Sequence, residues 1–229
     1  MIAAILGRLE DCRTIAVGAS SPIPAAAALL AREKWDARVL MLGDRRWLTD
    51  GGRELFDCAA QGRIDAFFLS GGQIDGKANV NLLGTGPYPR LERRLPGSFG
   101  SAYLYFVVPR VILFREEHSL QTTPQQVDAI SAPGVSPSGV YRPGGPVALV
   151  TGRAVFGFDR DRGRFALESV HGGETSGSVR AATGFDYDGP VEVPQTAPLA
   201  RADRTLLHGR IAEELAGAYP RFAAALAAE

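Results

Sequence analysis

Short apolar runs alternate with longer segments of helical spacing over the first third of the chain. Compact apolar runs at 14–17, 39–42 and 64–69 lie next to turn-forming residues, which is typical of buried strands. The segments 25–33 and 51–62 between them have the apolar spacing of helices. This alternation predicts parallel strands joined by crossover helices, and therefore an open, mostly parallel α/β sheet flanked by helices.

The rest of the chain is richer in turns. Two alternating segments, 154–159 and 164–170, flank Asp161-Arg-Gly163 and predict a β-hairpin. The segment 202–228 is helical in spacing, with an interruption at Pro220. We interpret residues 1–229 as a single domain. Other apolar runs predict short buried strands, at 111–114, 127–130 and 147–151.

Charge and cysteine content exclude several classes of function. Lys+Arg and Asp+Glu each total 25, so no net field favours a nucleic acid or an anionic membrane as a partner. Every apolar stretch is shorter than the roughly 20 residues that cross a bilayer, and no secretion signal is evident, so we expect a cytoplasmic protein. Cys12 and Cys58 lack the spacing of a metal site, so we predict no metal and no disulfide.

A first glycine-containing turn follows the strand predicted at 14–17. Gly18, Ser20 and Ser21 precede a helix, where amides and hydroxyls can bind a phosphate or a thioester oxygen. The alternative is ordinary helix capping before Pro22, which is common for Ser-Pro pairs.

A second glycine-rich loop follows the strand predicted at 64–69. Paired Gly71 and Gly72 allow a close approach of the backbone to a ligand, and the amide side chains behind them can bind an amide-rich molecule such as pantetheine. The alternative is a loop whose amides satisfy its own turns. The amide side chains belong to Gln73, Asn79 and Asn81.

A third turn enters a helix predicted up to Val108. Successive amides around Gly97, Ser98 and Gly100 can form a nest for an oxyanion, and Phe99 or Tyr103 can supply an apolar wall. The alternative is a structural turn at the start of a helix. No GxGxxG sequence opens the first helix, so this is not a dinucleotide-binding pattern.

The order of these segments resembles the β subunit of glutaconate-type family I coenzyme A (CoA) transferases. The resemblance covers nearly the whole chain, from Gly18 to Phe185. It implies a CoA-transferase-like α/β fold, an α-type partner subunit and a CoA thioester as substrate, with no tightly bound cofactor. The matching segments are Gly71-Gly-Gln-Ile-Asp75 with Asn79-Val-Asn81, Leu95-Pro-Gly-Ser-Phe-Gly100, Arg115-Glu-Glu-His118, Val127-Asp-Ala-Ile-Ser-Ala-Pro-Gly134 and the stretch from His171 to Phe185.

One departure from the family pattern bears on the chemistry. The resemblance places a nucleophilic glutamate after the second strand, where this chain has Leu42 and Gly43. Asp44 is the nearest acid and a weak catalytic candidate, because it lies late on the turn and is one methylene shorter. The resemblance extends to steroid ring-opening CoA-thioester hydrolases, whose β subunits also lack this glutamate and whose α subunit supplies the carboxylate. A third interpretation is a non-catalytic structural subunit.

Overall fold

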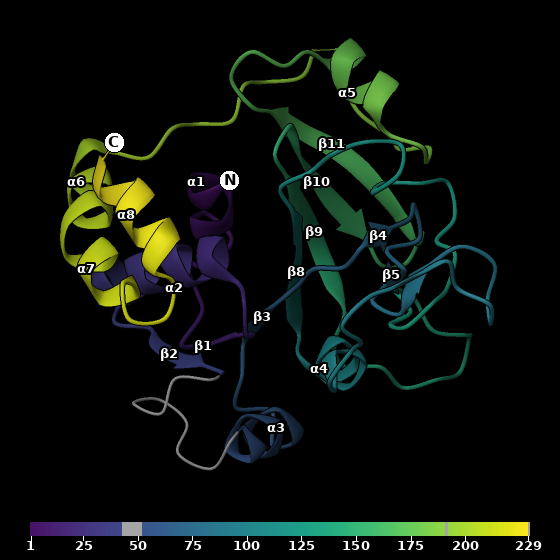
Figure 1. The fold of residues 1–229 in the computed structure, drawn as a ribbon, viewed down its shortest axis with the longest axis horizontal. Coiled ribbons are helices and arrows are strands. Elements are labelled where there is room, and N and C mark those ends of the chain that lie inside the picture. The colour runs from purple at the N-terminus through teal and green to yellow at the C-terminus, as the bar shows by residue number, and fades with distance from the viewer. Residues whose placement is uncertain (43–51, 191, 229) are drawn as a thin grey trace. The chain divides into compact units, whose positions relative to one another are not determined.

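The computed structural model describes residues 1–42, 52–190 and 192–228, which form two compact units (Figure 1). Unit 1 consists of Met1–Phe68 and Ala197–Glu229, and unit 2 of Leu69–Thr196. Unit 1 is therefore built from two separate sections of the chain. Each unit is described by itself below.

Three parallel strands form the centre of unit 1. β1 (Thr14–Val17) pairs with β2 (Arg38–Met41) on one side and with β3 (Ala66–Leu69) on the other. Ile15 lies opposite Val39 and Ala66 and is fully buried, as an apolar run in a central strand requires. The parallel arrangement predicted from the alternating pattern is confirmed here.

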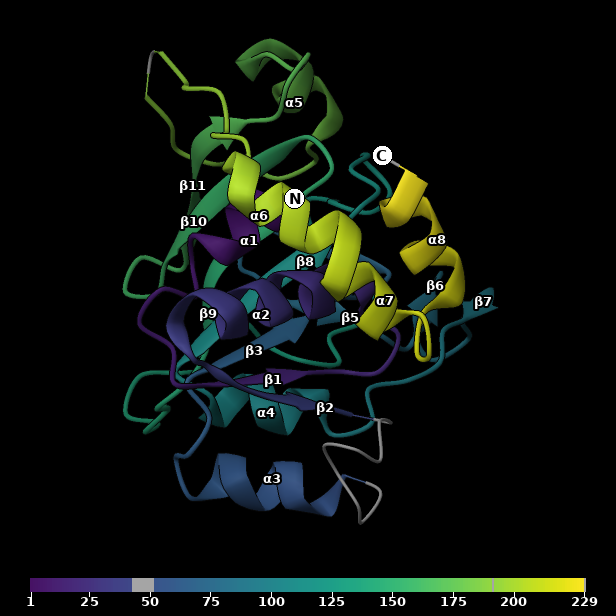
Figure 2. The same cartoon turned by 90° about the vertical axis from the view of Figure 1, so that its left-hand side faces the viewer.

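Helices pack on these strands, and the longest is α2 (Pro22–Trp35). Proline in its first turn and Asp36 in the left-handed conformation at its end mark its limits. Figure 2 shows α2 beside β1 and β2 on one side and α7 on another. The other helical elements of unit 1 are α1 (Ile2–Leu6), α3 (Arg53–Ala60), α6 (Arg201–Leu206), the kinked turn η1 (Leu207–Ile211), α7 (Ala212–Leu215) and α8 (Pro220–Ala228).

Ion pairs join α2 to the C-terminal section of unit 1. The Arg32 guanidinium donates to both carboxylate oxygens of Glu214, over 2.8 and 2.7 Å. Lys34 Nζ donates to Asp203 Oδ1 over 2.9 Å, and the Asp203 side chain is only 9% exposed. Both contacts tie residues near the start of the chain to residues near its end.

A mixed four-stranded arrangement forms the centre of unit 2. β8 (Arg110–Arg115) and β9 (Pro146–Thr151) are parallel. β10 (Ala154–Asp159) pairs antiparallel with β9 and with β11 (Arg164–Val170), and the predicted hairpin is confirmed at the predicted residues. The rings of Phe156, Phe165 and Phe185 pack together as its core.

Short elements complete unit 2, most of them between β3 and β8. They are β4 (Gln73–Ile74), β5 (Val80–Asn81), β6 (Gly84–Thr85), β7 (Arg93–Arg94), α4 (Ser101–Val107) and α5 (Ser176–Ala182). β4 pairs with β5, and β6 with β7, both antiparallel.

Several features differ from the sequence predictions, among them the short strands β4 to β7, which were not predicted. The strand predicted at 127–130 is wrong, because the N–H groups of Val127 and Asp128 donate to the side chains of Asp75 and Gln73 instead of to a neighbouring strand. Helix α5 was not predicted, although Thr175 and Ser178 form a reciprocal capping box at its start. Across the described residues, no helix is long and apolar enough to span a membrane.

Candidate functional site

The glycine-rich loop after β3 is built around a buried pair of amide side chains. Asn81 Nδ2 donates to Gln73 Oε1 over 2.7 Å and to the Gly84 carbonyl over 2.6 Å. Asn81 Oδ1 accepts the N–H groups of Leu83 (3.0 Å) and Gly84 (3.2 Å), and the residue is 0% exposed. The Asn81 amide therefore satisfies four backbone or side-chain groups of its own loop.

A second polar group closes the turn between β4 and β5. Asp75 Oδ1 accepts the N–H groups of Lys77 and Asn79 (both 3.0 Å), and Asn79 Nδ2 donates to Asp75 Oδ2 over 3.1 Å. Ala78 between them has a φ of 58°. The buried Tyr105 hydroxyl donates to the Ala78 carbonyl over 2.8 Å and anchors this turn to α4.

The segment 127–134 lies directly against this loop. Gln73 Oε1 accepts the Asp128 N–H over 3.0 Å, and Asn79 Oδ1 accepts the Gly134 N–H over 3.1 Å. Ala132 bridges to Val80 of β5. Residues about fifty positions apart in sequence thus share one hydrogen-bond network.

Packing inside the unit leaves no room for a side chain at Gly71, whereas a side chain at Gly72 would have to displace the end of the Leu95 side chain. A Cβ on Gly71 would lie 2.5 Å from Val80 Cγ1 and 2.9 Å from the Asn81 carbonyl oxygen, and one on Gly72 would overlap Leu95 Cδ1. Arg115 Nη1 also donates to the Gly71 carbonyl over 2.9 Å. Arg115 was placed in a matching segment from the sequence but was assigned no role in this loop.

The turn before α4 is also hydrogen-bonded to this network. The Gly97 N–H donates to the Leu82 carbonyl over 3.0 Å, directly after Asn81 in the chain. Gly97, Phe99 and Gly100 have φ values of 95°, 36° and 73°, so the backbone here adopts a conformation that favours glycine. The Ser98 carbonyl accepts the Ser101 N–H over 2.7 Å and also accepts from the Ser101 hydroxyl.

The turn at Gly97 is open, whereas the backbone at Gly71 and Gly72 is closely packed. A Cβ on Gly97 would meet no heavy atom within 4 Å, and the Phe99 side chain is 71% exposed. The turn therefore leaves room for a ligand against its backbone beside an exposed aromatic ring. The structure brings together Gly71, Gly72, Gln73, Asn79, Asn81 and the turn Gly97, Ser98, Phe99 and Gly100; their assignment to substrate binding stays a prediction.

His118 and His171 both bind Thr151 at the end of β9. His118 Nε2 lies 2.8 Å from the Thr183 hydroxyl, which itself donates to the Val179 carbonyl. The Nε2–H tautomer is therefore the one that fits, with Nδ1 accepting from the Thr151 hydroxyl over 2.8 Å. Burial, and the nearby Arg153 charge, lower the pKa of His118 to about 4. His118 is thus a neutral structural histidine.

His171 has a similar structural setting. Its Nε2 donates to the Thr151 carbonyl over 2.9 Å, and its Nδ1 lies 2.9 Å from the Thr196 hydroxyl. Burial lowers the pKa of this imidazole as well. Both rings are occupied by hydrogen bonds within unit 2.

The first predicted turn lies in unit 1. Ser20 is exposed with a φ of 54°, and Gly18 adjoins Phe67. The Ser21 N–H donates to the Tyr219 hydroxyl over 3.4 Å, and its own hydroxyl donates to the Ala19 carbonyl. Because prolines at 22 and 24 have no N–H, the start of α2 offers few donors to an anion. The binding role of Gly18, Ser20 and Ser21 stays a prediction.

The remaining catalytic candidate, Asp44, lies outside the described residues, as does Gly43. Leu42, which precedes them, is held by its N–H, which donates to the Val17 carbonyl over 2.9 Å. Within residues 1–42, 52–190 and 192–228, no group of His, Cys, Asp and Glu side chains could hold a metal ion.

No family model matches the chain. It is similar to the B-type subunit of 3-oxoadipate CoA-transferase of Pseudomonas knackmussii, with 30% identity over 142 residues. These residues are 59% of this chain and 54% of that protein, so the match spans about half the length of the relative.

Solved structures resemble the chain over almost its full length. Glutaconate coenzyme A-transferase of Acidaminococcus fermentans has a TM-score of 0.80 at 20% identity and covers 94% of each chain. IpdAB of Rhodococcus jostii RHA1 has a TM-score of 0.78 at 22% identity, covering 91% of each chain. The decarboxylase AibA/AibB has a TM-score of 0.74 at 20% identity, covering 92% of this chain and 94% of that one. Both the sequence resemblance and the predicted fold class are confirmed by these comparisons.

Proposed function

We propose that this chain, which has the fold of CoA-transferase subunits, is the β-type subunit of a heteromeric CoA transferase-like enzyme that acts on acyl-CoA thioesters. In this proposal the CoA thioester enters as a substrate, and an α-type subunit completes the active site. The cytoplasmic location expected from the sequence stays a prediction.

The observation that carries the proposal is the interlocking of the motif segments in unit 2. Gln73 and Asn81 fix the glycine-rich loop, the 127–134 segment adds its N–H groups, and Gly97 is tied to the residue after Asn81. Motif segments that are separate in the sequence are therefore hydrogen-bonded together, and their backbones form one continuous surface. This surface includes the open turn at Gly97, which can approach an uncharged amide-containing arm or a thioester oxygen.

The residues after β2 indicate which subunit supplies the catalytic carboxylate in our proposal. The family resemblance expects a glutamate there, and the sequence has Leu42 and Gly43. Nucleophilic catalysis needs a carboxylate within bonding distance of the thioester carbon. A second candidate function is therefore hydrolysis of a CoA thioester by a carboxylate of the α subunit, with this chain supplying the glycine turn.

Co-expression with an α-type partner tests the proposal. We expect thioester turnover by the purified pair and none by the isolated chain. Gly97→Ala should lower kcat/KM of the pair about tenfold or more, because the added methyl group would occupy the space left for the ligand. Gly139→Ala is the matched control, since Gly139 also has positive φ (83°) and open space at its Cβ position. Full turnover by the isolated chain would overturn the requirement for a partner.

Chemical trapping separates transfer from hydrolysis. If Asp44 is an offset nucleophile, borohydride or hydroxylamine treatment during turnover will modify Asp44, and Asp44→Asn will abolish activity. Our proposal of a partner carboxylate expects no adduct in this chain and an active Asp44→Asn pair. Calorimetry addresses the non-catalytic alternative: a pair that binds no acyl-CoA would show that the subunit is structural.

A further inference from the structure

The hairpin formed by β6 and β7 carries a concentration of positive charge. Arg90, Arg93 and Arg94 lie within five positions and are all exposed, with Glu92 the acid between them. Among the described residues, none of these three guanidinium groups forms an ion pair or a side-chain hydrogen bond. The chain as a whole has no net charge, so this local excess is a feature of the hairpin.

The hairpin is held in place by the amide network of the candidate site. Both the N–H and the carbonyl of Gly84 bind the Asn81 amide, and the Gly86 N–H donates to Asp128 Oδ2 over 2.8 Å. The Glu92 N–H donates to the Thr85 carbonyl over 2.9 Å. The arginines are therefore presented from an ordered backbone, which reduces the entropy lost when they bind a ligand.

The base of the hairpin is continuous with the glycine turns. The Leu95 N–H donates to the Leu83 carbonyl over 2.9 Å, and the Leu95 side chain packs where a Cβ of Gly72 would be. Two residues further along, Gly97 begins the open turn. A ligand whose uncharged arm lies on this turn can thus extend its other end along the hairpin.

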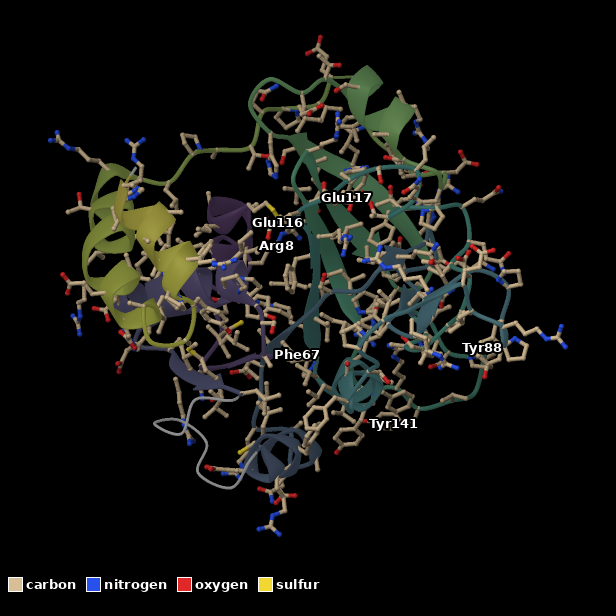
Figure 3. The ribbon with its side chains drawn as sticks, viewed as in Figure 1. Arg8, Phe67, Tyr88, Glu116, Glu117 and Tyr141 are labelled. Carbon is tan, nitrogen blue, oxygen red and sulfur yellow. The ribbon has the colours of Figure 1, made fainter. Side chains whose placement is uncertain are left out.

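The side chains of the hairpin suit a nucleotide. Arg93 and Arg94 are successive residues of a strand, so they point to opposite faces, and both are exposed because this sheet has only two strands. Guanidinium groups bind phosphate through paired N–H donors. Tyr88 is 66% exposed, and Figure 3 shows its ring at the outer rim of unit 2, where it can stack on a base.

We infer that the β6–β7 hairpin binds the nucleotide end of the CoA thioester, with Arg90 and whichever of Arg93 and Arg94 lies on the ligand's face of the strand on its phosphates, and Tyr88 beside its adenine. The inference rests on the proposed function, because it assigns the charged half of the same substrate. CoA combines an uncharged pantetheine arm with a diphosphate, a ribose phosphate and a base. The uncharged arm matches the glycine turn, and the phosphates and the base match the arginines and the tyrosine of the hairpin. The rival occupant is an acidic surface of the partner subunit.

Charge reversal with a truncated ligand tests the inference. Calorimetry of the assembled pair would compare CoA with pantetheine, which lacks the nucleotide. For the variant Arg93→Glu/Arg94→Glu we expect binding of CoA to weaken at least about tenfold and binding of pantetheine to change less than about twofold. The matched control is Arg201→Glu/Arg204→Glu on α6, which changes the net charge equally at two exposed arginines and should leave both affinities unchanged.

Each outcome has a distinct meaning. Unchanged CoA affinity in the hairpin variant overturns the inference and leaves the proposed function standing. Loss of the partner subunit in size-exclusion chromatography, with CoA affinity weakened no more than pantetheine affinity, assigns the hairpin to the subunit interface and also overturns it. If the unsubstituted pair binds neither CoA nor pantetheine, the proposed function itself fails. The milder Arg93→Gln/Arg94→Gln variant, expected to weaken CoA binding in the same direction, guards against misfolding of the charge-reversed chain.

Discussion

Gln73 and Asn81 share a 2.7 Å hydrogen bond in which the amide of Asn81 is the donor, and the accepting oxygen of Gln73 also binds the N–H of Asp128. Asn81 also binds Gly84, so this pair of amide side chains joins the glycine-rich loop to the start of the β6–β7 hairpin and to the 127–134 segment. The candidate site therefore depends on an uncharged donor at position 81.

Asn81→Asp tests this dependence. The substitution replaces the NH₂ group by an oxygen that faces two acceptors, Gln73 Oε1 and the Gly84 carbonyl, so we expect a loss of about 3 kcal/mol in the free energy of unfolding. Urea denaturation monitored by circular dichroism would measure it. Gln61→Glu, at an exposed position, should change stability by less than about 0.5 kcal/mol. Equal stability of Asn81→Asp and the unsubstituted chain would contradict the role given to Asn81.

Gly134 has no room for a side chain. A Cβ there would overlap the Lys77 carbonyl and lie 2.6 Å from the carbonyl atoms of Ala78, and backbone cannot move aside as a flexible side chain can. We expect Gly134→Ala to destabilise the chain by about 2 kcal/mol or more, measured by thermal unfolding. Gly172→Ala is the comparison, because nothing lies within 4 Å of its Cβ position. Similar melting temperatures for the two variants would show that the 127–134 segment can shift.

Tyr105→Phe removes one buried hydroxyl. The Ala78 carbonyl would lose the donor that now lies 2.8 Å away, at a residue that is already in the left-handed conformation. The expected cost is about 1 to 2 kcal/mol in chemical denaturation. Tyr141, which is strongly exposed and labelled in Figure 3, supplies the control: Tyr141→Phe should be neutral. A neutral Tyr105→Phe would mean that this hydrogen bond adds nothing to stability.

The buried imidazole of His118 makes stability depend on pH. Its pKa is about 4 in the folded chain against the ordinary 6.5, so the unfolded chain binds the extra proton more readily between these values. Its contribution is complete above pH 6.5 and is lost as the pH falls towards 4, up to about 3 kcal/mol. Protonation would also force the Thr151 hydroxyl to turn from Nδ1 towards the Ala154 carbonyl.

Urea denaturation at pH 7.5, 6.5, 5.5 and 4.5 would measure this slope. In His118→Gln the part of the slope due to this imidazole should disappear, while the part due to His171 remains. An unchanged pH profile in that variant would assign the acid sensitivity to other groups.

Local pattern was sufficient to predict the longer strands and most helices, but not the two-residue strands β4 to β7. β1, β10 and β11 have the predicted limits, because each is a complete apolar or alternating run between turn residues. The strand predicted at 127–130 is wrong because its N–H groups bind side chains 52 and 55 positions away. The local hydrophobic pattern contains no information about such distant contacts.

The sequence indicated which segments to consider as a candidate site, but not the hydrogen bonds that join them. The motif order indicated which segments matter, and the amide side chains were recognised as either ligand-binding or loop-forming. Their partners lie in distant segments, and Arg115 binds a carbonyl 44 positions away, so these contacts needed the folded chain. The positive charge of Arg90, Arg93 and Arg94 is visible in the sequence, but its position beside the glycine turns is not.

The division of unit 1 into two chain sections affects how the protein emerges from the ribosome. Arg32 and Lys34 of α2 bind residues that are translated 182 and 169 positions later. At about 5 to 20 residues per second, α2 waits roughly 10 to 40 s for Glu214 and Asp203. Unit 2 is one continuous stretch and is complete before then. Until the C-terminal section is translated, the nascent N-terminal section therefore exposes the surface of α2 that contacts α7 and η1 in the folded chain.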